Sequence, residues 1–336
     1  MATPVVESRR RGRDRSNPNP TPRRRGWRPS TSAAALPLAL LALAIVGGSF
    51  TSGFFSTDNI KSVLINASLT GIVAVAMTPL TLSGNMVALN LGSSAMLSGI
   101  LFVTLLNHGV PPIVAVVAVA LAMLAVGCVQ ALLVIRGLNP VVTTLAADSI
   151  IYGAVAELTN LRDVIPKHHT LAWLGSSLPL GVPIQVFIFA IVAVLVSLFT
   201  SKTVAGRQII LAGAGRETAE LSGVSRPKVI IWAFGILSLG VAVAGVLNAA
   251  QLGIASSTDF PTLTFDVIAA VLVGGTSFQG GKGNPARSAG GAILIAVVTN
   301  IMLLHNLSTG WQDTGEGLLV LVMIVVLHVL SRRSER

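Results

Sequence analysis

Long apolar runs are the feature that most constrains this chain of 336 residues. A membrane-spanning helix needs about 20 mostly apolar residues, and ten runs have roughly that character. They cover 34–55, 63–83, 85–106, 112–135, 139–158, 184–200, 229–250, 264–279, 289–305 and 316–331. Charged residues make up only 11% of the chain, against about 25% in typical soluble domains. The sequence therefore predicts an all-α, polytopic membrane protein.

The positions of the basic residues predict the direction of the spans. If the N-terminus lies in the cytoplasm, 20 of the 23 Lys and Arg residues fall on the cytoplasmic side. The remaining three, Lys61, Arg162 and Lys167, fall in outer loops. Cytoplasmic loops of membrane proteins carry an excess of Lys and Arg. We therefore expect ten spans with both termini in the cytoplasm. The membrane is expected to be the inner (plasma) membrane of the cell.

The chain divides into one membrane domain and two tails. Residues 1–33 form an Arg-rich segment broken by Pro and Asn, which is predicted to be a disordered cytoplasmic tail. No module of interleaved basic and aromatic residues follows it, so we do not expect nucleic-acid binding. Residues 34–331 form the transmembrane domain, with an inner loop at about 201–228, and 332–336 form a cytoplasmic C-terminal tail.

The residues that intramembrane enzymes use are not grouped in this sequence. The single cysteine, Cys128, cannot form a disulfide within the chain. The five histidines show no metal-ligand spacing inside a span, so we expect no metal site. Paired carboxylates and a nucleophile beside a base are also lacking. An intramembrane enzyme is therefore the least favoured hypothesis.

Seven glycines fall within VGGTSFQGGKGNPARSAGG, residues 273–291. A phosphate-binding P-loop needs Ser or Thr after its lysine, but Lys282 is followed by Gly283. The stretch from Gly281 to Ala286 matches the dinucleotide-binding spacing, but that motif requires an acidic residue about 20 positions later, and 289–312 contain none. Nucleotide binding is therefore not expected here.

A break in a membrane helix explains the same glycines better. Gly274 and Gly275 interrupt the eighth span, and Gly280, Gly281 and Gly283 form a tight turn on the cytoplasmic side. Unpaired backbone groups are tolerated at membrane depth only inside protein or along a watery cavity. Short, interrupted helices of this kind are typical of transport sites.

Polar side chains within the spans are candidates for a substrate pathway. Amides and hydroxyls can either join helices by hydrogen bonds or contact an uncharged polar solute. A charge in mid-span is costly and should face the bundle interior, while an acid at a helix start can cap that helix or line a vestibule. The candidates are Asn66, Thr70, Thr78, Asn85, Asn90, Asp148 in mid-span, and Asp266 at the start of the eighth span.

Several motifs resemble one family in the same order along the chain. The run FDVIAAVLVGGTSFQGGKG, residues 265–283, is similar to the LDAIAAVVLGGTSLxGGxG pattern of ribose-, xylose- and galactose-type ABC importer permeases. The segment from Gly206 through Gly215-Arg216-Glu217 to Gly223 agrees as well, as do Gly137–Pro140 and Trp311-Gln312. The resemblance covers residues 60–331. One departure is Ala88, which stands where the family usually has aspartate.

The resemblance implies a permease subunit whose halves are inverted repeats. It implies a homodimer, or a pair with a homologous permease, that forms the translocation path for a monosaccharide or similar solute. A separate cytoplasmic ABC ATPase would bind the ATP and dock on loop 201–228, so the chain needs no cofactor of its own. An extracytoplasmic solute-binding protein would deliver the substrate. The expected coupling residues are Arg216, Glu217, Glu220 and Gly223, in and after a short helix.

A stand-alone secondary transporter is the alternative hypothesis. It would need membrane acids for ion coupling, and Asp148 is the main one available. Uptake that collapses with the proton gradient but persists without an ATPase would favour it. The sequence leaves the identity of the transported solute open.

Overall fold

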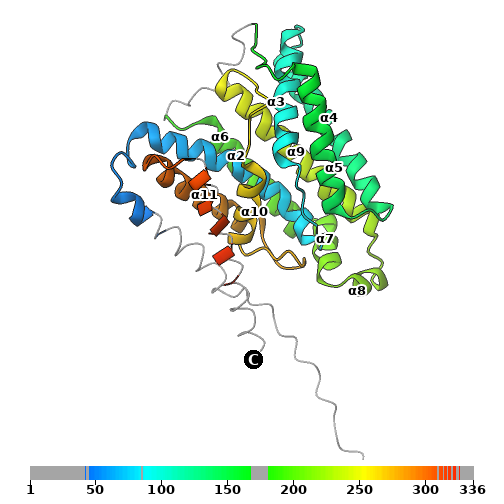
Figure 1. The fold of residues 1–336 in the computed structure, drawn as a ribbon. Coiled ribbons are helices and arrows are strands. Elements are labelled where there is room, and N and C mark those ends of the chain that lie inside the picture. The colour runs from blue at the N-terminus through cyan, green and yellow to red at the C-terminus, as the bar shows by residue number, and fades with distance from the viewer. Residues whose placement is uncertain are drawn as a thin grey trace, which may run out of the picture. The chain divides into compact units, whose positions relative to one another are not determined.

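The computed structural model describes residues 42, 45–84, 86–167, 181–308, 310–312, 314–315, 317–318, 321–322 and 325. Within these residues the named elements are all helices (Figure 1). They are α2 (Thr57–Leu82), α3 (Leu91–Asn107), α4 (Pro112–Ile135), α5 (Pro140–Thr159), α6 (Ile184–Lys202), α7 (Val204–Ala214), α8 (Arg216–Leu221), α9 (Arg226–Leu252), α10 (Leu263–Val273) and α11 (Pro285–Leu304). The described β pairing is a bridge between Val164 and Ala255.

Six of the described helices are long and apolar enough to cross a membrane: α2, α4, α5, α6, α9 and α11. Helices α3, α7 and α10 are apolar but shorter. The prediction of an α-helical, polytopic membrane protein is therefore confirmed. The predicted tail at 1–33, the first part of the span at 34–55 and most of the span at 316–331 lie outside the described residues. The count of ten spans and the cytoplasmic termini stay predictions.

Helix α10 is shorter than the predicted span of 264–279. It ends at Val273, and its C-cap is Gly274. Gly275 follows with a φ of +74°, a left-handed conformation that glycine adopts without steric cost. At 1.5 Å per residue α10 is about 16 Å long, roughly half of the bilayer core. The predicted break at Gly274 and Gly275 is thus present, and α10 is a half-length helix.

Helix α3 begins at Leu91, so the predicted start at residue 85 is wrong. Side chains from other helices hold the preceding segment in an irregular conformation. Thr144 Oγ1 of α5 accepts a hydrogen bond from the Leu89 amide at 3.2 Å. Thr264 Oγ1 of α10 accepts one from the Gly92 amide at 3.2 Å. These tertiary bonds replace the bonds that a longer helix would make within itself.

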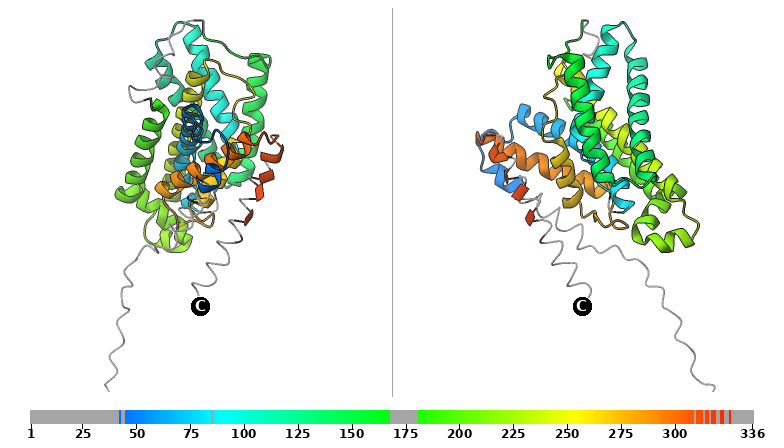
Figure 2. Two further views of the ribbon diagram at one scale, coloured as in Figure 1. Left: turned by 90° about the vertical axis from the view of Figure 1, so that its left-hand side faces the viewer. Right: turned by 45° about the vertical axis from the view of Figure 1, so that its right-hand side comes forward.

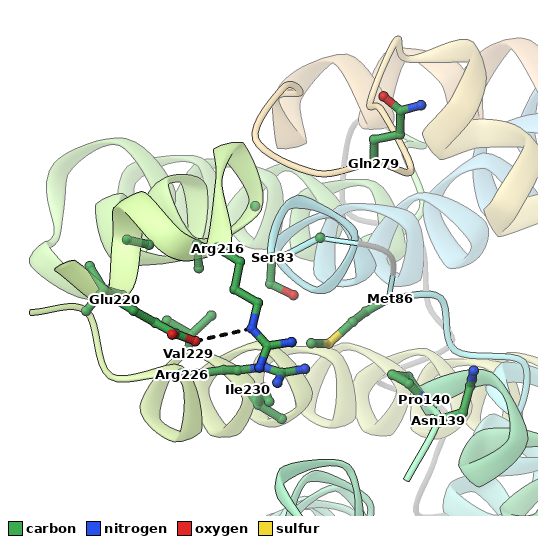
Figure 3. A pocket seen from close by; sticks show the side chains of 15 residues that line it. Ser83, Met86, Asn139, Pro140, Arg216, Glu220, Arg226, Val229, Ile230 and Gln279 are labelled. Atoms are coloured by element: carbon green, nitrogen blue, oxygen red, sulfur yellow. Dashed lines mark hydrogen bonds and ion pairs between the residues drawn. The ribbon is translucent and has the colours of Figure 1, made fainter. Parts of the chain in front are cut away.

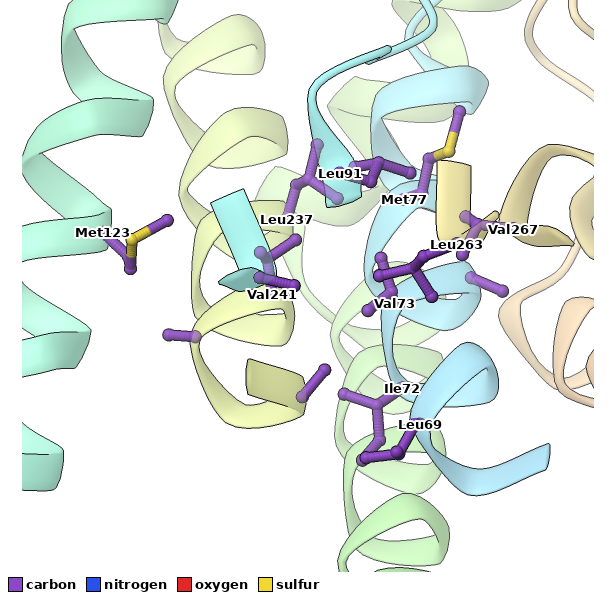
Figure 4. Close-up of a cluster of buried hydrophobic side chains, with 14 of the residues drawn as sticks. Leu69, Ile72, Val73, Met77, Leu91, Met123, Leu237, Val241, Leu263 and Val267 are labelled. Carbon is purple, nitrogen blue, oxygen red and sulfur yellow. The ribbon is translucent and has the colours of Figure 1, made fainter. Parts of the chain in front are cut away.

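The hydrophobic core is centred on α2 and α9. Helix α2 packs against α9, α10 and α11, and helix α9 packs against α2, α3 and α4. Ile72, Val73 and Met77 of α2 are fully buried, and Leu237 and Val241 of α9 reach the same cluster (Figure 4). Helices α4 and α5 lie on one side of this core, and α11 lies on the other (Figure 2). The packing of α2 on α10 and α11 parallels the packing of α9 on α3 and α4, as internal repeats would predict, whereas α2 packs in addition on α6.

Candidate functional site

A polar cavity of about 340 Å³ lies among α2, α10, α11 and the end of α9. Four asparagines line it, Asn59, Asn66, Asn248 and Asn300, and we call it the amide cavity. Thr70, Thr262, Asp266 and Thr299 add hydroxyl and carboxyl groups to the wall. The volume lies in the range of small-molecule sites, which is about 300–1,000 Å³.

Paired asparagines join two walls of the amide cavity. Asn59 Nδ2 donates to Asn300 Oδ1 at 2.9 Å, and Asn300 Nδ2 donates back to Asn59 Oδ1 at 2.8 Å. Asn300 is buried, so its amide would be costly without a partner. The pair fixes the start of α2 against the end of α11.

Asp266 reaches the cavity from the first turn of α10. Its Oδ2 accepts a hydrogen bond from Thr262 Oγ1 at 3.0 Å. The positive end of the helix dipole favours a carboxylate at this position. Thr262 itself is the N-cap, so Asp266 lies inside the helix and does not form its cap.

The structure brings together three of the predicted pathway residues: Asn66, Thr70 and Asp266 line the amide cavity. Asn90 lies in a different cluster with Ser94. Asn85 lies outside the described residues.

Sequence reasoning missed three of the four cavity asparagines, Asn59, Asn248 and Asn300, as well as the hydroxyl residues Ser62, Thr262 and Thr299. The signal that could have found the asparagines is an amide side chain close to the end of an otherwise apolar span.

Thr78 is used in packing and does not line the cavity. It is fully buried, and its Oγ1 donates to the Ala74 carbonyl at 2.8 Å. The same oxygen lies 2.9 Å from Ser288 Oγ of α11, which lies 3.4 Å from Thr276 Oγ1. Three buried hydroxyls therefore join α2, α11 and the segment after α10.

Asp148 lies in the middle of α5, and its predicted place in the substrate pathway stays a prediction. It is partly exposed on α5 and lines none of the described cavities. Helix α5 packs against α3 and α4 and buries Thr143, Thr144, Ile151 and Val155. Asp148 lies four residues after Thr144 and three before Ile151, so it lies on the same side of the helix as these two residues.

Three backbone segments meet where the glycine turn lies, at Gly84, Gly213, Gly280 and Gly281. We call this contact the glycine junction. The Gly281 amide donates to the Leu82 carbonyl at the end of α2, at 2.9 Å. A Cβ at Gly213 of α7 would overlap that same carbonyl oxygen. A Cβ at Gly280 would lie 2.5 Å from Gly84 Cα.

Backbone conformation adds a second requirement for glycine in this turn. Gly280 and Gly281 have φ values of +90° and +70°. A Cβ at Gly283 would in addition lie 2.6 Å from a side-chain carbon of Thr276. The glycine turn is therefore a close-packed contact between α2, α7 and the α10–α11 connection.

A second cavity of about 380 Å³, the α8 pocket, lies beside this junction (Figure 3). Arg216, Glu220 and Arg226 project toward it, and Asn139 and Gln279 lie on its far side. Arg216 Nε pairs with Glu220 Oε1 at 3.2 Å. Both side chains are more than half exposed, so the pair adds little stability and leaves the groups accessible.

The predicted short helix at Arg216 is present as α8, and Gly223 follows it in a left-handed conformation with a φ of +76°. The preceding helix α7 was not predicted. Its signal was the apolar run around Ile209, which is fully buried in a small cluster with Leu82, Ala219 and Val229. Loop 201–228 is thus largely helical and packs on the ends of α2 and α9.

Burial raises the pKa of Asp259, in the connection between α9 and α10, above its ordinary value of 3.8. A hydrogen bond from the Ser256 amide lowers the pKa, the negative charge of Asp163 raises it, and a hydrogen bond with Asn248 lowers it again. Burial has the largest effect. This carboxyl is therefore linked through Asn248 to the wall of the amide cavity.

Comparisons with known proteins show which family the chain resembles. A family model described as "Branched-chain amino acid transport system / permease component" matches residues 59–327. The ribose import permease protein of Haemophilus influenzae is 27% identical over 302 residues, covering 88% of this chain and 93% of that protein. No solved structure matches the chain at a significant level.

Two permeases of Escherichia coli K12 are also similar. A probable ABC transporter permease is 32% identical over 305 residues, covering 84% of this chain and 86% of that protein. The D-allose transport system permease protein is 26% identical over 295 residues, covering 87% and 90%. The chain therefore belongs to this family of transport-system permease components, and it is a multi-pass membrane protein of the inner membrane.

Proposed function

We propose that the chain is the transmembrane subunit of an ABC importer and forms the translocation pathway for a monosaccharide or similar small polar solute. A separate ATPase subunit drives the cycle. The observation that carries this proposal is the amide cavity of about 340 Å³ in a chain similar to permeases named for ribose and allose.

The chemistry of the amide cavity suits a neutral, polyhydroxylated solute. Amide and hydroxyl groups each donate and accept hydrogen bonds, which matches sugar hydroxyls. Among the described residues that line the cavity, Asp266 is the one ionisable residue, and none is Lys or Arg. An anionic solute would find no positive partner among these residues.

Loop 201–228 is the proposed docking site for the ATPase. Glu217 and Glu220 lie on α8 and are both exposed, and Arg216 is exposed beside them. The glycine junction joins this loop directly to α2 and to the connection between α10 and α11. A displacement of α8 by the ATPase would reach α2 through closely packed backbone.

Partners complete the proposed importer. The partly exposed Asp148 and the open face of α5 support contact with a second permease copy or a homologous permease. A solute-binding protein would deliver the substrate at the opposite end of the chain from the ATPase.

Reconstitution tests the proposal. The chain is co-expressed with an ABC ATPase and a solute-binding protein from the same cell, and the purified assembly is placed in lipid vesicles. We expect the ATPase to co-purify and radiolabelled D-ribose or D-allose to accumulate only with ATP. Failure of the ATPase to co-purify, together with uptake that follows a proton gradient, would instead favour the secondary transporter built on Asp148.

A further inference from the structure

A buried polar cluster lies between α3, α4 and α9, apart from the amide cavity. Asn90, Ser94, Gln130 and Ser238 form it, and each is at most 8% exposed. They surround a cavity of only about 10 Å³. Asn90 Nδ2 donates to Ser94 Oγ at 2.8 Å. Gln130 Nε2 is buried without a hydrogen-bond partner, which is unfavourable unless a ligand or water completes it.

The start of α3 in this cluster repeats the start of α10 in the amide cavity. Asn90 is the N-cap of α3, and Thr262 is the N-cap of α10. Each N-cap side chain donates to the side chain four residues later, Ser94 in one case and Asp266 in the other. The leucine after each N-cap is buried and lines its cavity.

Helices α4 and α11 show the same correspondence. Each begins with a proline, and the three positions at which α4 lines its cavity have counterparts on α11 with identical spacing from that proline. These positions are Met123, Val126 and Gln130 on α4, and Ala296, Thr299 and Leu303 on α11. Since α2 and α9 exchange places in the two sets of contacts, the cluster is the repeat-related counterpart of the amide cavity.

The two counterparts differ in size, at about 340 Å³ and about 10 Å³, and in side chains, since Gln130 of the cluster corresponds to Leu303 of the amide cavity. We propose that Asn90, Ser94, Gln130 and Ser238 form a second hydrogen-bonding site for the neutral polyhydroxylated solute. It is collapsed in this structure and opens as the amide cavity closes. The inference rests on the proposed function. Gln130 Nε2 supplies a hydrogen-bond donor that has no partner while the cluster is collapsed.

A substitution at Gln130 separates solute binding from a structural role. Gln130→Met keeps the length of the side chain and removes its buried amide, so the thermal midpoint should stay equal or rise. ATP-driven uptake of radiolabelled D-ribose or D-allose by the reconstituted importer should fall at least tenfold. The control is Gln185→Met on α6, which removes a fully buried partner of Gln251 and should lower the midpoint while uptake per folded molecule persists.

Unchanged uptake in Gln130→Met would overturn the inference. A lower midpoint with unchanged uptake would show that the cavity, which is about large enough for one water molecule, holds a structural water instead. If the unmodified importer accumulates no monosaccharide or similar polar solute with ATP, the proposed function fails first. The two failures are therefore distinguishable.

Thiol labelling tests the opening independently of the solute. Ser94→Cys and Thr299→Cys are prepared separately in a Cys128→Ala background, because the native Cys128 is exposed. We expect a maleimide to label the two positions in opposite states, one nucleotide-free and the other trapped with ATP and vanadate. Ser68→Cys, at a buried position of α2 outside both cavities, should stay unlabelled. Ser94→Cys unlabelled in both states would contradict the inference.

Discussion

The glycine junction and the amide cavity lie at opposite ends of α2 and are built in opposite ways. At the junction, backbone touches backbone, and no Cβ fits at Gly213 or Gly280 without displacing a neighbour. In the cavity, side chains surround open space and present amides and hydroxyls to it. The glycine junction has no space in which one segment could shift alone, so its segments move together. The amide cavity has space in which side chains can rearrange around a solute.

This contrast assigns different tasks to the two regions. A close-packed contact transmits a displacement, because packed interiors have low compressibility. A polar cavity with exchangeable hydrogen bonds recognises a small solute. Helix α2 belongs to both regions and is about 39 Å long, estimated at 1.5 Å per residue. Each prediction below disturbs one region and asks whether the other follows.

The largest effect is expected from Gly213→Ala at the junction. The new methyl group would overlap the Leu82 carbonyl, so the free energy of unfolding should fall by about 3 kcal/mol and ATP-driven uptake should be lost. Thermal unfolding and uptake measure the two effects. Gly153→Ala is the matched control, because nothing lies within 4 Å of a Cβ there. It should be neutral or gain up to about 1 kcal/mol. Equal behaviour of the two variants would remove the junction from the account.

The next effect is expected in the amide cavity, from Asn300→Leu. It leaves Asn59 without its reciprocal partner, so the unfolding free energy should fall by about 1–3 kcal/mol. The KM for uptake should rise about tenfold. The double variant Asn59→Leu, Asn300→Leu should regain part of the stability and none of the affinity, since both partners are then apolar. Full recovery of KM in the double variant would mean that the pair only packs.

Charge reversal on α8 should separate docking from stability. Glu217→Lys with Glu220→Lys should abolish co-purification with the ATPase, while the unfolding free energy changes by about 1 kcal/mol or less, because both groups are exposed. Glu157→Lys, at an exposed position near the end of α5, should retain the ATPase. Retention of the ATPase by the doubly reversed chain would exclude α8 as its docking site.

The smallest effect concerns Asp259 and pH. Its pKa in the folded chain is raised, so between 3.8 and that raised value the folded state binds more protons than the unfolded state. The unfolding free energy contributed by this group therefore falls as pH rises through that window. Asp259→Asn should remove this decline, which thermal midpoints measured across the window will test. An identical slope in both proteins would contradict the pKa shift.

The sequence predicted elements best where composition changes sharply. The span at 112–135 coincides with α4, because Pro112 starts it and Arg136 with Gly137 follows its end. Prediction from the sequence failed where tertiary contacts decide the backbone conformation. The apolar residues before Leu91 look helical, but Thr144 and Thr264 hold them in another conformation.

The candidate site was predicted in part for a similar reason. Asn66, Thr70 and Asp266 stand out as polar residues in apolar runs, and they do line one cavity. Thr78 stands out equally, but only the packing of α11 shows that its hydroxyl is buried against Ser288. The glycines were predicted as a turn, whereas their contact with Gly213 joins segments about 70 residues apart, which local pattern cannot reveal.

The source of energy for uptake tests the central claim most directly. Vesicles are prepared with the chain alone, and with the chain together with its ATPase and solute-binding protein. Each preparation is given ATP or a proton gradient, and accumulation of radiolabelled D-ribose or D-allose is followed. We predict concentrative uptake only in the complete assembly and only with ATP. Concentrative uptake by the chain alone under a proton gradient would contradict the account.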